Sequence, residues 1–132
     1  MPNDGSEEFL SAAEQDLSAL EDLKYFGFRS ANTACFLAQQ YAEKMIKARL
    51  LQLGLKFERS HNLVFLMDDL GPGKNLDLAR DYCRILNQYE AGTRYPYDGM
   101  RIYSSEDAEQ AYELALEIPY LIGLYEKDSS NL

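Results

Sequence analysis

Residues 31–53 constrain the fold most, because apolar and small side chains cover well over half of the helix that their spacing predicts. One line at three- and four-residue steps is Ala34, Ala38, Tyr41, Met45 and Ala48, and the adjacent line is Cys35, Ala42, Ile46 and Leu50. A helix with so wide an apolar surface packs against several neighbours. The stretch therefore predicts a central helix, capped by Ser30 and ended at Gly54.

Two further helices are predicted in the first half of the chain. One follows Ser6, a suitable N-cap residue, and its buried stripe would be Phe9, Ala13, Leu17, Leu20 and Leu23. It should end at a turn over residues 25–29, which contains Gly27. The other would be a short helix from His61 to Leu70, capped by Ser60 and ended by the Gly-Pro-Gly sequence at 71–73.

The second half predicts two more helices. Asn75 would cap the first, which should end near Gly92 and bury Ala79, Tyr82, Cys83, Leu86 and Tyr89. Residues 93–103 would form a loop long enough to suggest a role in function. Ser104 or Ser105 would cap the last helix, whose inward residues would be Ala108, Ala111, Tyr112, Ala115 and Ile118.

No segment shows the sustained alternation of a strand, and short connectors between amphipathic helices favour antiparallel neighbours. The sequence therefore predicts an all-α fold: an up-and-down four-helix bundle with one short additional helix. We expect a single domain over residues 1–132, with its core at about 7–126 and a frayed tail at 127–132.

Composition indicates the compartment. Apolar residues make up 46% and charged residues 27% of the chain, as in an ordinary globular protein. No apolar run approaches the roughly 18 residues of a membrane helix, and the first eight residues are polar and acidic. We expect a cytoplasmic protein without membrane contact. Cys35 and Cys83 should be reduced core residues, and two Cys with one His are too few for a zinc site. No metal or cofactor is expected.

The charge distribution limits the kind of partner. A formal net charge of −9 argues against a general nucleic-acid binder, which needs clustered Lys and Arg to neutralise phosphates. The charge is uneven, however, because residues 25–61 carry six basic and two acidic residues. A local basic groove is therefore compatible with the sequence.

Three clusters could carry chemistry. In the central helix, Gln40, Lys44 and Lys47 lie at i, i+4 and i+7, so they follow one face. This face would be either a solvated surface with a Glu43–Lys47 pair or the polar wall of a binding groove. Arg59 and His61 belong to the second cluster, the Arg-Ser-His-Asn sequence at 59–62.

His61 is the only histidine in the chain and titrates near neutrality in its free form. It would be either a helix-start residue bonded to nearby backbone or a proton-transfer group. In the third cluster, Arg94 is followed by Tyr95, Pro96 and Tyr97. These residues would form either a rigid turn or a phosphate-reading arginine beside aromatic rings.

These clusters, in this order and spacing, resemble the HEPN (higher eukaryotes and prokaryotes nucleotide-binding) domain. The resemblance runs from about Phe9 to Leu124. It includes the Ala-Cys-Phe-Leu-Ala-Gln-Gln-Tyr-Ala-Glu-Lys sequence at 34–44, the Ser-His-Asn-Leu sequence at 60–63 and the Arg-Tyr-Pro turn at 94–96.

The resemblance implies a helical bundle that forms homodimers and that often pairs with a minimal nucleotidyltransferase, in some cases as a toxin–antitoxin system. Ribonuclease members use an Arg followed four to six residues later by His, brought together across the dimer. Here no histidine follows Arg94. In some pairs the transferase modifies a tyrosine near that motif, a region where this chain has Tyr95, Tyr97 and Tyr103.

Our leading hypothesis is a non-catalytic binding module, a dimer that partners a nucleotidyltransferase or binds nucleotide or RNA. Its ligand-binding residues would be Gln40, Lys44, Lys47, Arg59, His61, Arg94, Tyr95 and Tyr97. The alternative is a divergent metal-independent ribonuclease that uses Arg94 and His61. A purely structural dimer domain is a third possibility.

Overall fold

The computed structural model describes residues 3–57, 59–90 and 101–127. These residues form five α-helices and two short 3-10 helices, and no strand occurs among them. The long helices are α1 (Ser6–Tyr25), α2 (Ala31–Gln52), α4 (Lys74–Leu86) and α5 (Ser105–Leu121). Between them lie α3 (Leu63–Met67), η1 (Asp68–Leu70) and η2 (Asn87–Tyr89). The predicted all-α class, with four long helices and one short one, is confirmed.

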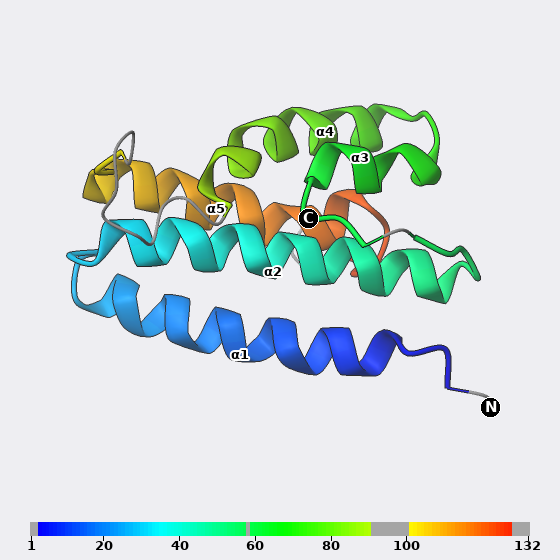
Figure 1. Cartoon of the computed structure of the whole chain (residues 1–132), viewed down its shortest axis with the longest axis horizontal. Coiled ribbons are helices and arrows are strands. Elements are labelled where there is room, and N and C mark those ends of the chain that lie inside the picture. The colour runs from blue at the N-terminus through cyan, green and yellow to red at the C-terminus, as the bar shows by residue number, and fades with distance from the viewer. Residues whose placement is uncertain (1–2, 58, 91–100, 128–132) are drawn as a thin grey trace.

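Helix α2 is the central element of the bundle, as its wide apolar surface predicts. It packs against α1 on one side and α5 on the other, while α4 lies against α5 and carries α3 beside it (Figure 1). Both predicted apolar lines of α2 are buried: Ala34, Cys35, Ala38, Tyr41, Ala42, Met45, Ile46, Ala48 and Leu50. The small residues in these lines let the neighbouring helices approach closely.

The turn between α1 and α2 uses two left-handed residues in succession. Gly27 has φ 73° and Phe28 has φ 57°, an unusual value for a residue with a side chain. Phe28 is nevertheless buried, with its ring 5.9 Å from that of Tyr112 on α5. Burial of this aromatic ring offsets the backbone strain and fixes the direction in which α2 begins.

Several predicted helix ends differ from the structure. Ser6 is the first residue of α1, with Gly5 at the N-cap, whereas Ser30 occupies the N-cap position of α2 as predicted but makes no capping hydrogen bond with its side chain. The fourth helix begins at Lys74 after Gly73, not after Asn75. It ends at Leu86, and η2 continues it only to Tyr89, short of the predicted end near Gly92.

The third helical segment begins later than predicted. It starts at Leu63, with Asn62 as its N-cap, and not at His61, while its last turn, the 3-10 segment η1, ends at Leu70 as predicted. The Asn62 side chain accepts a hydrogen bond from Phe65 N at 3.2 Å, which is the capping role that Ser60 was predicted to have. His61 therefore lies in the connector before α3, not within a helix.

The predictions for α5 and for the two cysteines are confirmed. Ser104 caps α5 in a reciprocal capping box with Asp107, and the five predicted inward residues of α5 are buried. Cys35 and Cys83 are buried and free. No helix among the described residues is both long and apolar enough to cross a lipid bilayer.

Candidate functional site

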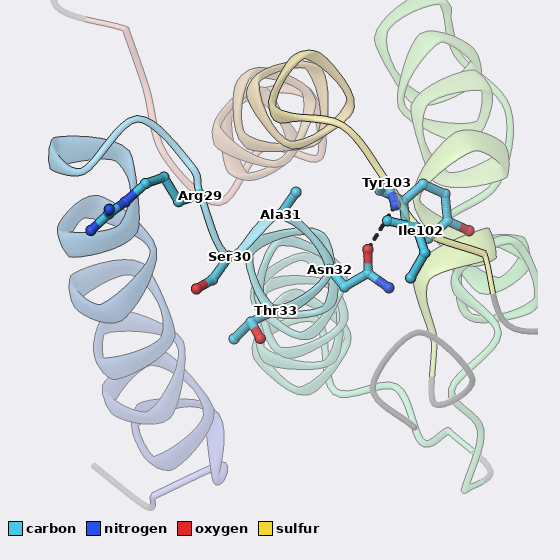
Figure 2. A pocket seen from close by; sticks show the side chains of 7 residues that line it. All are labelled: Arg29, Ser30, Ala31, Asn32, Thr33, Ile102 and Tyr103. Atoms are coloured by element: carbon cyan, nitrogen blue, oxygen red, sulfur yellow. Dashed lines mark hydrogen bonds between the residues drawn. The ribbon is translucent and has the colours of Figure 1, made fainter. Parts of the chain in front are cut away.

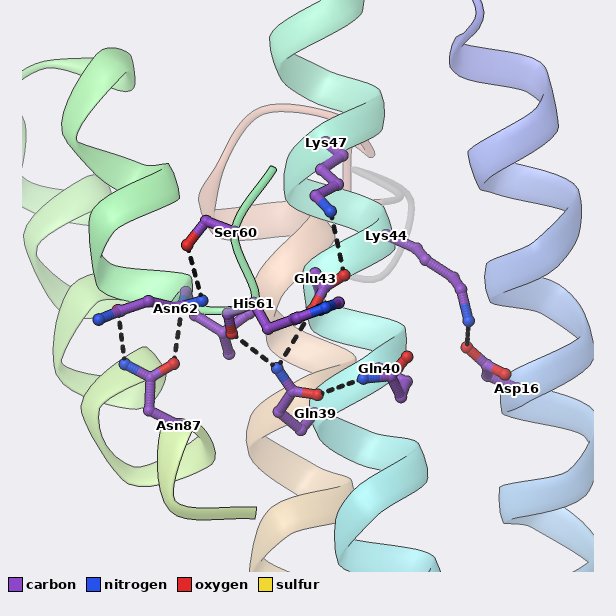
Figure 3. A network of polar contacts seen from close by, with 11 residues as sticks. Asp16, Gln39, Gln40, Glu43, Lys44, Lys47, Ser60, His61, Asn62 and Asn87 are labelled. Carbon is purple, nitrogen blue, oxygen red and sulfur yellow. Dashed lines mark hydrogen bonds and ion pairs between the residues drawn. The ribbon is translucent and has the colours of Figure 1, made fainter. Parts of the chain in front are cut away.

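A network of polar side chains interrupts the apolar surface of α2 where the connector to α3 crosses it. We call this set the α2 polar network: Gln39, Gln40, Glu43, Lys47 and His61 (Figure 3). All but His61 come from two consecutive turns of α2. Gln39 is fully buried, and the side chains of Glu43 and Lys47 are only 6% and 11% exposed. Buried polar groups at such density need a partner for every atom, so their geometry is informative.

Glu43 is the centre of the network. Its Oε2 lies 3.1 Å from Lys47 Nζ, which confirms the Glu43–Lys47 pair predicted from their i, i+4 spacing. Its Oε1 lies 2.9 Å from His61 Nδ1 and 3.4 Å from Gln39 Nε2. An ionised carboxylate can only accept hydrogen bonds, and three donors surround this one.

Gln39 links the helix to the connector. Its Nε2 donates to His61 O at 3.1 Å as well as to Glu43, so both of its amide hydrogens face acceptors. The Gln39 Oε1 must then accept, and it accepts from Gln40 Nε2 at 2.7 Å. These contacts fix which way both glutamine amides point, because exchanging O and N in either one would place like groups against each other.

The backbone around His61 is held from both sides. Gln39 binds the His61 carbonyl, and Asn62 N donates to Ser60 Oγ at 3.0 Å. On the α4 side, Leu63 N donates to Asn87 Oδ1 at 2.7 Å, and Asn87 Nδ2 donates to Asn62 Oδ1 at 2.9 Å. The His61 side chain itself is 64% exposed. It is therefore an accessible imidazole on a fixed connector.

A shallow pocket of about 250 Å³ opens beside this connector. Its lining consists of His61 and Asn62 from the connector, Asn87 from η2, and Glu90, which directly follows η2. The pocket is polar and could hold a small group that forms hydrogen bonds.

The predicted line of Gln40, Lys44 and Lys47 divides in the structure. Gln40 and Lys47 join the α2 polar network, whereas Lys44 reaches the other side of α2 and pairs with Asp16 on α1 (Figure 3). The ammonium group of Lys47 also lies 5.5 Å from the centre of the Phe57 ring. Both lysines are thus engaged by acidic partners within the protomer.

The other predicted site residues are placed as follows. Arg59 is exposed in the connector. Arg94, Tyr95 and Tyr97 lie outside the described residues, so their distance from the lysines of α2 stays a matter of prediction. Tyr103, just beyond that segment, is buried, and its ring centre lies 4.8 Å from that of Tyr89.

A second pocket, of about 330 Å³, lies at the end of the bundle where α2 begins (Figure 2). Residues 29–33, Ile102 and Tyr103 line it. Asn32 joins the two sides, because its Oδ1 accepts from Tyr103 N and its Nδ2 donates to Arg101 O, both at 2.8 Å. Asn32 thereby anchors the start of α5 to the start of α2.

A third pocket, of about 480 Å³, lies between the start of α4 and the end of α5, and its lining includes Asn75, Tyr120, Tyr125 and Lys127. Burial raises the pKa of Tyr125, with Glu14 and Tyr120 as lesser contributors. Neither this pocket nor the one beside Asn32 contains residues of the α2 polar network. Among the described residues, no group of three or more His, Cys, Asp and Glu side chains is placed to bind a metal ion.

Sequence reasoning missed the roles of Gln39, Asn62 and Asn87, and it assigned Glu43 only to a surface pair. One signal was available for Gln39 and Glu43: both are polar residues among buried positions of the helix that was predicted to be central. A polar side chain on the apolar side of a buried helix needs an internal partner. For Asn87 the sequence offered no comparable signal.

Two solved structures share this fold. The crystal structure of TT1696 from Thermus thermophilus superposes with a TM-score of 0.75 at 24% identity, covering 92% of this chain and 98% of TT1696. ST0689, described as an archaeal HEPN homologue, gives a TM-score of 0.70 at 26% identity, covering 93% of this chain and 97% of ST0689. Among curated proteins, none matches the chain.

The family follows from a direct sequence match. The profile of the HEPN domain matches residues 6–122, which span every helix from the start of α1 to the end of α5. The resemblance inferred from the motifs is thereby confirmed, and the chain belongs to the HEPN domain family.

Proposed function

We propose that this protein is a non-catalytic HEPN binding module that acts as a homodimer and binds nucleotide or RNA, alone or together with a nucleotidyltransferase partner. The observation that supports it is the α2 polar network. Burying Gln39, Glu43 and Lys47 costs desolvation energy that an apolar helix face would avoid. In return, the arrangement fixes an exposed imidazole, His61, beside a polar pocket.

The proposed ligand would meet two kinds of group. Gln40 and His61 provide directed hydrogen bonds, while Arg59 and Arg94 provide positive charge for phosphates. Tyr95 and Tyr97 would offer rings on which a base stacks. Lys47 acts through Glu43, whereas the charge of Lys44 is paired with Asp16 on the α1 side. The Arg-to-His spacing of the ribonuclease members is missing after Arg94, which supports binding over cleavage.

Titration of the full chain with nucleotides and with short RNA tests this proposal. We expect saturable binding that weakens in Arg94→Ala and in His61→Ala but not in Arg84→Ala, a matched control on the exposed side of α4. Light scattering during size-exclusion chromatography would report the dimer, and co-expression with a small nucleotidyltransferase would report the partner. Absence of binding, together with an Arg94→Ala variant that still captures the partner, would remove the site.

A second function, cleavage of RNA without a metal ion, is favoured by one contact. Glu43 accepts from His61 Nδ1, and a carboxylate that orients an imidazole in this way is a common arrangement around a general base. Arg94 would then stabilise the charge that develops on the phosphate. Incubation of tRNA and mRNA in EDTA is the direct test. Intact RNA at high protein concentration would rule this function out, and equal cleavage by His61→Ala would rule out His61 as its proton-transfer group.

A further inference from the structure

In the α2 polar network, the donor and acceptor of each hydrogen bond can be assigned, starting from the Glu43 carboxylate. This assignment determines which polar atoms remain available to bind a ligand. Glu43 can only accept, so the His61 Nδ1 that faces it at 2.9 Å carries the hydrogen in the neutral ring. The second ring nitrogen, Nε2, then carries a lone pair. Within residues 3–57, 59–90 and 101–127 this Nε2 has no hydrogen-bond partner.

The orientations of the Gln39 and Gln40 side-chain amides follow from the same assignment of donors and acceptors. Gln39 donates to Glu43 and to the His61 carbonyl, so its oxygen is the atom that accepts from Gln40 Nε2. The amide of Gln40 is thereby oriented with its Oε1 turned away from Gln39 (Figure 3). In the described part of the chain this oxygen also has no hydrogen-bond partner.

The two free acceptors come from neighbouring parts of the α2 polar network. Gln40 precedes Glu43 by three residues, one helical turn, and His61 is bonded to Glu43 itself. A surface that presents two acceptors, next to a pocket that is lined in part by the acidic residue Glu90, matches a ligand with two donors and disfavours a bare phosphate. Two neighbouring hydroxyls on one ligand satisfy this requirement.

We propose that His61 Nε2 and Gln40 Oε1 accept hydrogen bonds from the vicinal 2′- and 3′-hydroxyls of a ribose, and that Glu43 and Gln39 are the positioning residues that impose this polarity. The inference rests on the proposed nucleotide- or RNA-binding function and specifies it further: the α2 polar network binds the sugar hydroxyls and thereby distinguishes ribose from deoxyribose. Phosphates and base are then left to groups outside the network.

The experiment is a calorimetric titration of the full chain with AMP, 2′-deoxy-AMP and 2′,3′-dideoxy-AMP at pH 8. We expect AMP to bind at least about tenfold more tightly than the dideoxy compound, since a site built around hydroxyl groups is left with unsatisfied acceptors without them. Inorganic phosphate should compete only for the groups that bind the AMP phosphate and should leave the preference for AMP over the dideoxy compound unchanged. An RNA tetranucleotide with a free 3′ end should bind more tightly than its DNA counterpart, which lacks the terminal 2′-hydroxyl.

Two variants separate this role from a merely structural one. Gln40→Leu should lose most of the ribose preference while its circular dichroism stays unchanged, and Gln52→Leu, the same change at the exposed end of α2, should keep it. Glu43→Gln should also lose the preference, because an amide facing His61 no longer dictates which ring nitrogen carries the hydrogen. Glu113→Gln on the exposed face of α5 is its control.

The outcomes are distinguishable. Equal affinity for AMP and dideoxy-AMP in the wild-type protein would overturn the ribose inference and leave nucleotide binding intact. Preserved ribose preference in Gln40→Leu would overturn the assignment of the acceptors. No binding of any nucleotide or RNA would overturn this inference together with the proposed function.

Discussion

His61 Nδ1 and Glu43 Oε1 lie 2.9 Å apart, although 18 residues separate them in sequence and they belong to the connector before α3 and to the middle of α2. The contact joins an imidazole that is largely exposed to a carboxylate that is almost completely buried. The buried partner can therefore hold the exposed one in a single orientation without taking up its outer nitrogen. Most of the following predictions concern the residues that maintain this relationship.

Glu43→Ala should strongly destabilise the fold. The substitution leaves Lys47 with a buried and unpaired ammonium group, and breaking a buried ion pair in this way costs about 3–5 kcal/mol. Urea denaturation followed by circular dichroism measures the loss. Lys47→Met in the same chain should recover much of it, because the unpaired charge is then removed. If the double variant were as unstable as the sum of the two single variants, Glu43 and Lys47 would not be coupled.

Asn87→Ala should loosen the connector while leaving the four long helices folded. The variant removes the acceptor of Leu63 N and the donor to Asn62 Oδ1, and an unsatisfied buried group costs about 1–3 kcal/mol. Hydrogen exchange measured by mass spectrometry should show faster exchange in residues 60–70. Asn75→Ala, the same change at an exposed position of α4, is the control. Unchanged exchange in the connector would mean that Asn87 does not fasten it.

Ser104→Ala should lower the stability of the protein by about 1 kcal/mol, the usual cost of losing an N-cap. Its hydroxyl accepts from Asp107 N at 3.1 Å, and Asp107 Oδ2 in turn accepts from Ser104 N at 2.9 Å. The adjacent variant Ser105→Ala keeps this capping box and should unfold like the wild type. Thermal denaturation of the two variants side by side compares the positions, and equal melting temperatures would contradict the assignment.

The free energy of unfolding should fall as the pH rises from about 9 to 12. Burial raises the pKa of the Cys35 and Cys83 thiols from 9.0 to about 12. The folded chain therefore keeps protons that the unfolded chain has already lost above pH 9, and the stability that is fully present below pH 9 is lost across this range. Each thiol contributes a slope of up to about 1.4 kcal/mol per pH unit.

Denaturation by urea at a series of pH values measures that slope. Cys83→Ala should make the slope shallower. The free energy of unfolding should still fall with pH in this variant, because burial also raises the pKa of Tyr41 and Tyr89. An identical slope in Cys83→Ala and the wild type would show that the thiol titrates alike in the folded and unfolded states, so that burial does not raise its pKa. At neutral pH, both cysteines should resist thiol reagents until the chain unfolds.

The helical bundle could be predicted from the sequence because each helix is encoded by the spacing of apolar residues within its own segment. Apolar residues at three- and four-residue spacing located all four long helices, and the exceptional width of the apolar surface at 31–53 identified α2 as central. Helix ends were less predictable, since several residues nearby can cap equally well. Ser60 and Asn62 both suit an N-cap, and the contact of Asn62 with Asn87, which lies 25 residues away, favours Asn62.

The candidate site could be predicted only in part, because its contacts are not local. The sequence indicated Gln40, Lys47 and His61, and it gave the spacing of Glu43 and Lys47. It did not show that Lys44, one residue after Glu43, would turn to Asp16 on α1. Nor could it show that the connector would bring His61 back to Glu43, since that depends on how α3 and α4 pack against α2.

Because His61 is the only histidine of the chain, its imidazole gives a single set of NMR signals. Long-range ¹H–¹⁵N correlation of the labelled protein at pH 8, without and with AMP, therefore measures the central contact directly. We predict a ring with the hydrogen on Nδ1 and a free lone pair on Nε2, and a shift of the Nε2 signal when AMP binds. A ring with its hydrogen on Nε2, or one unaffected by bound AMP, would contradict the account.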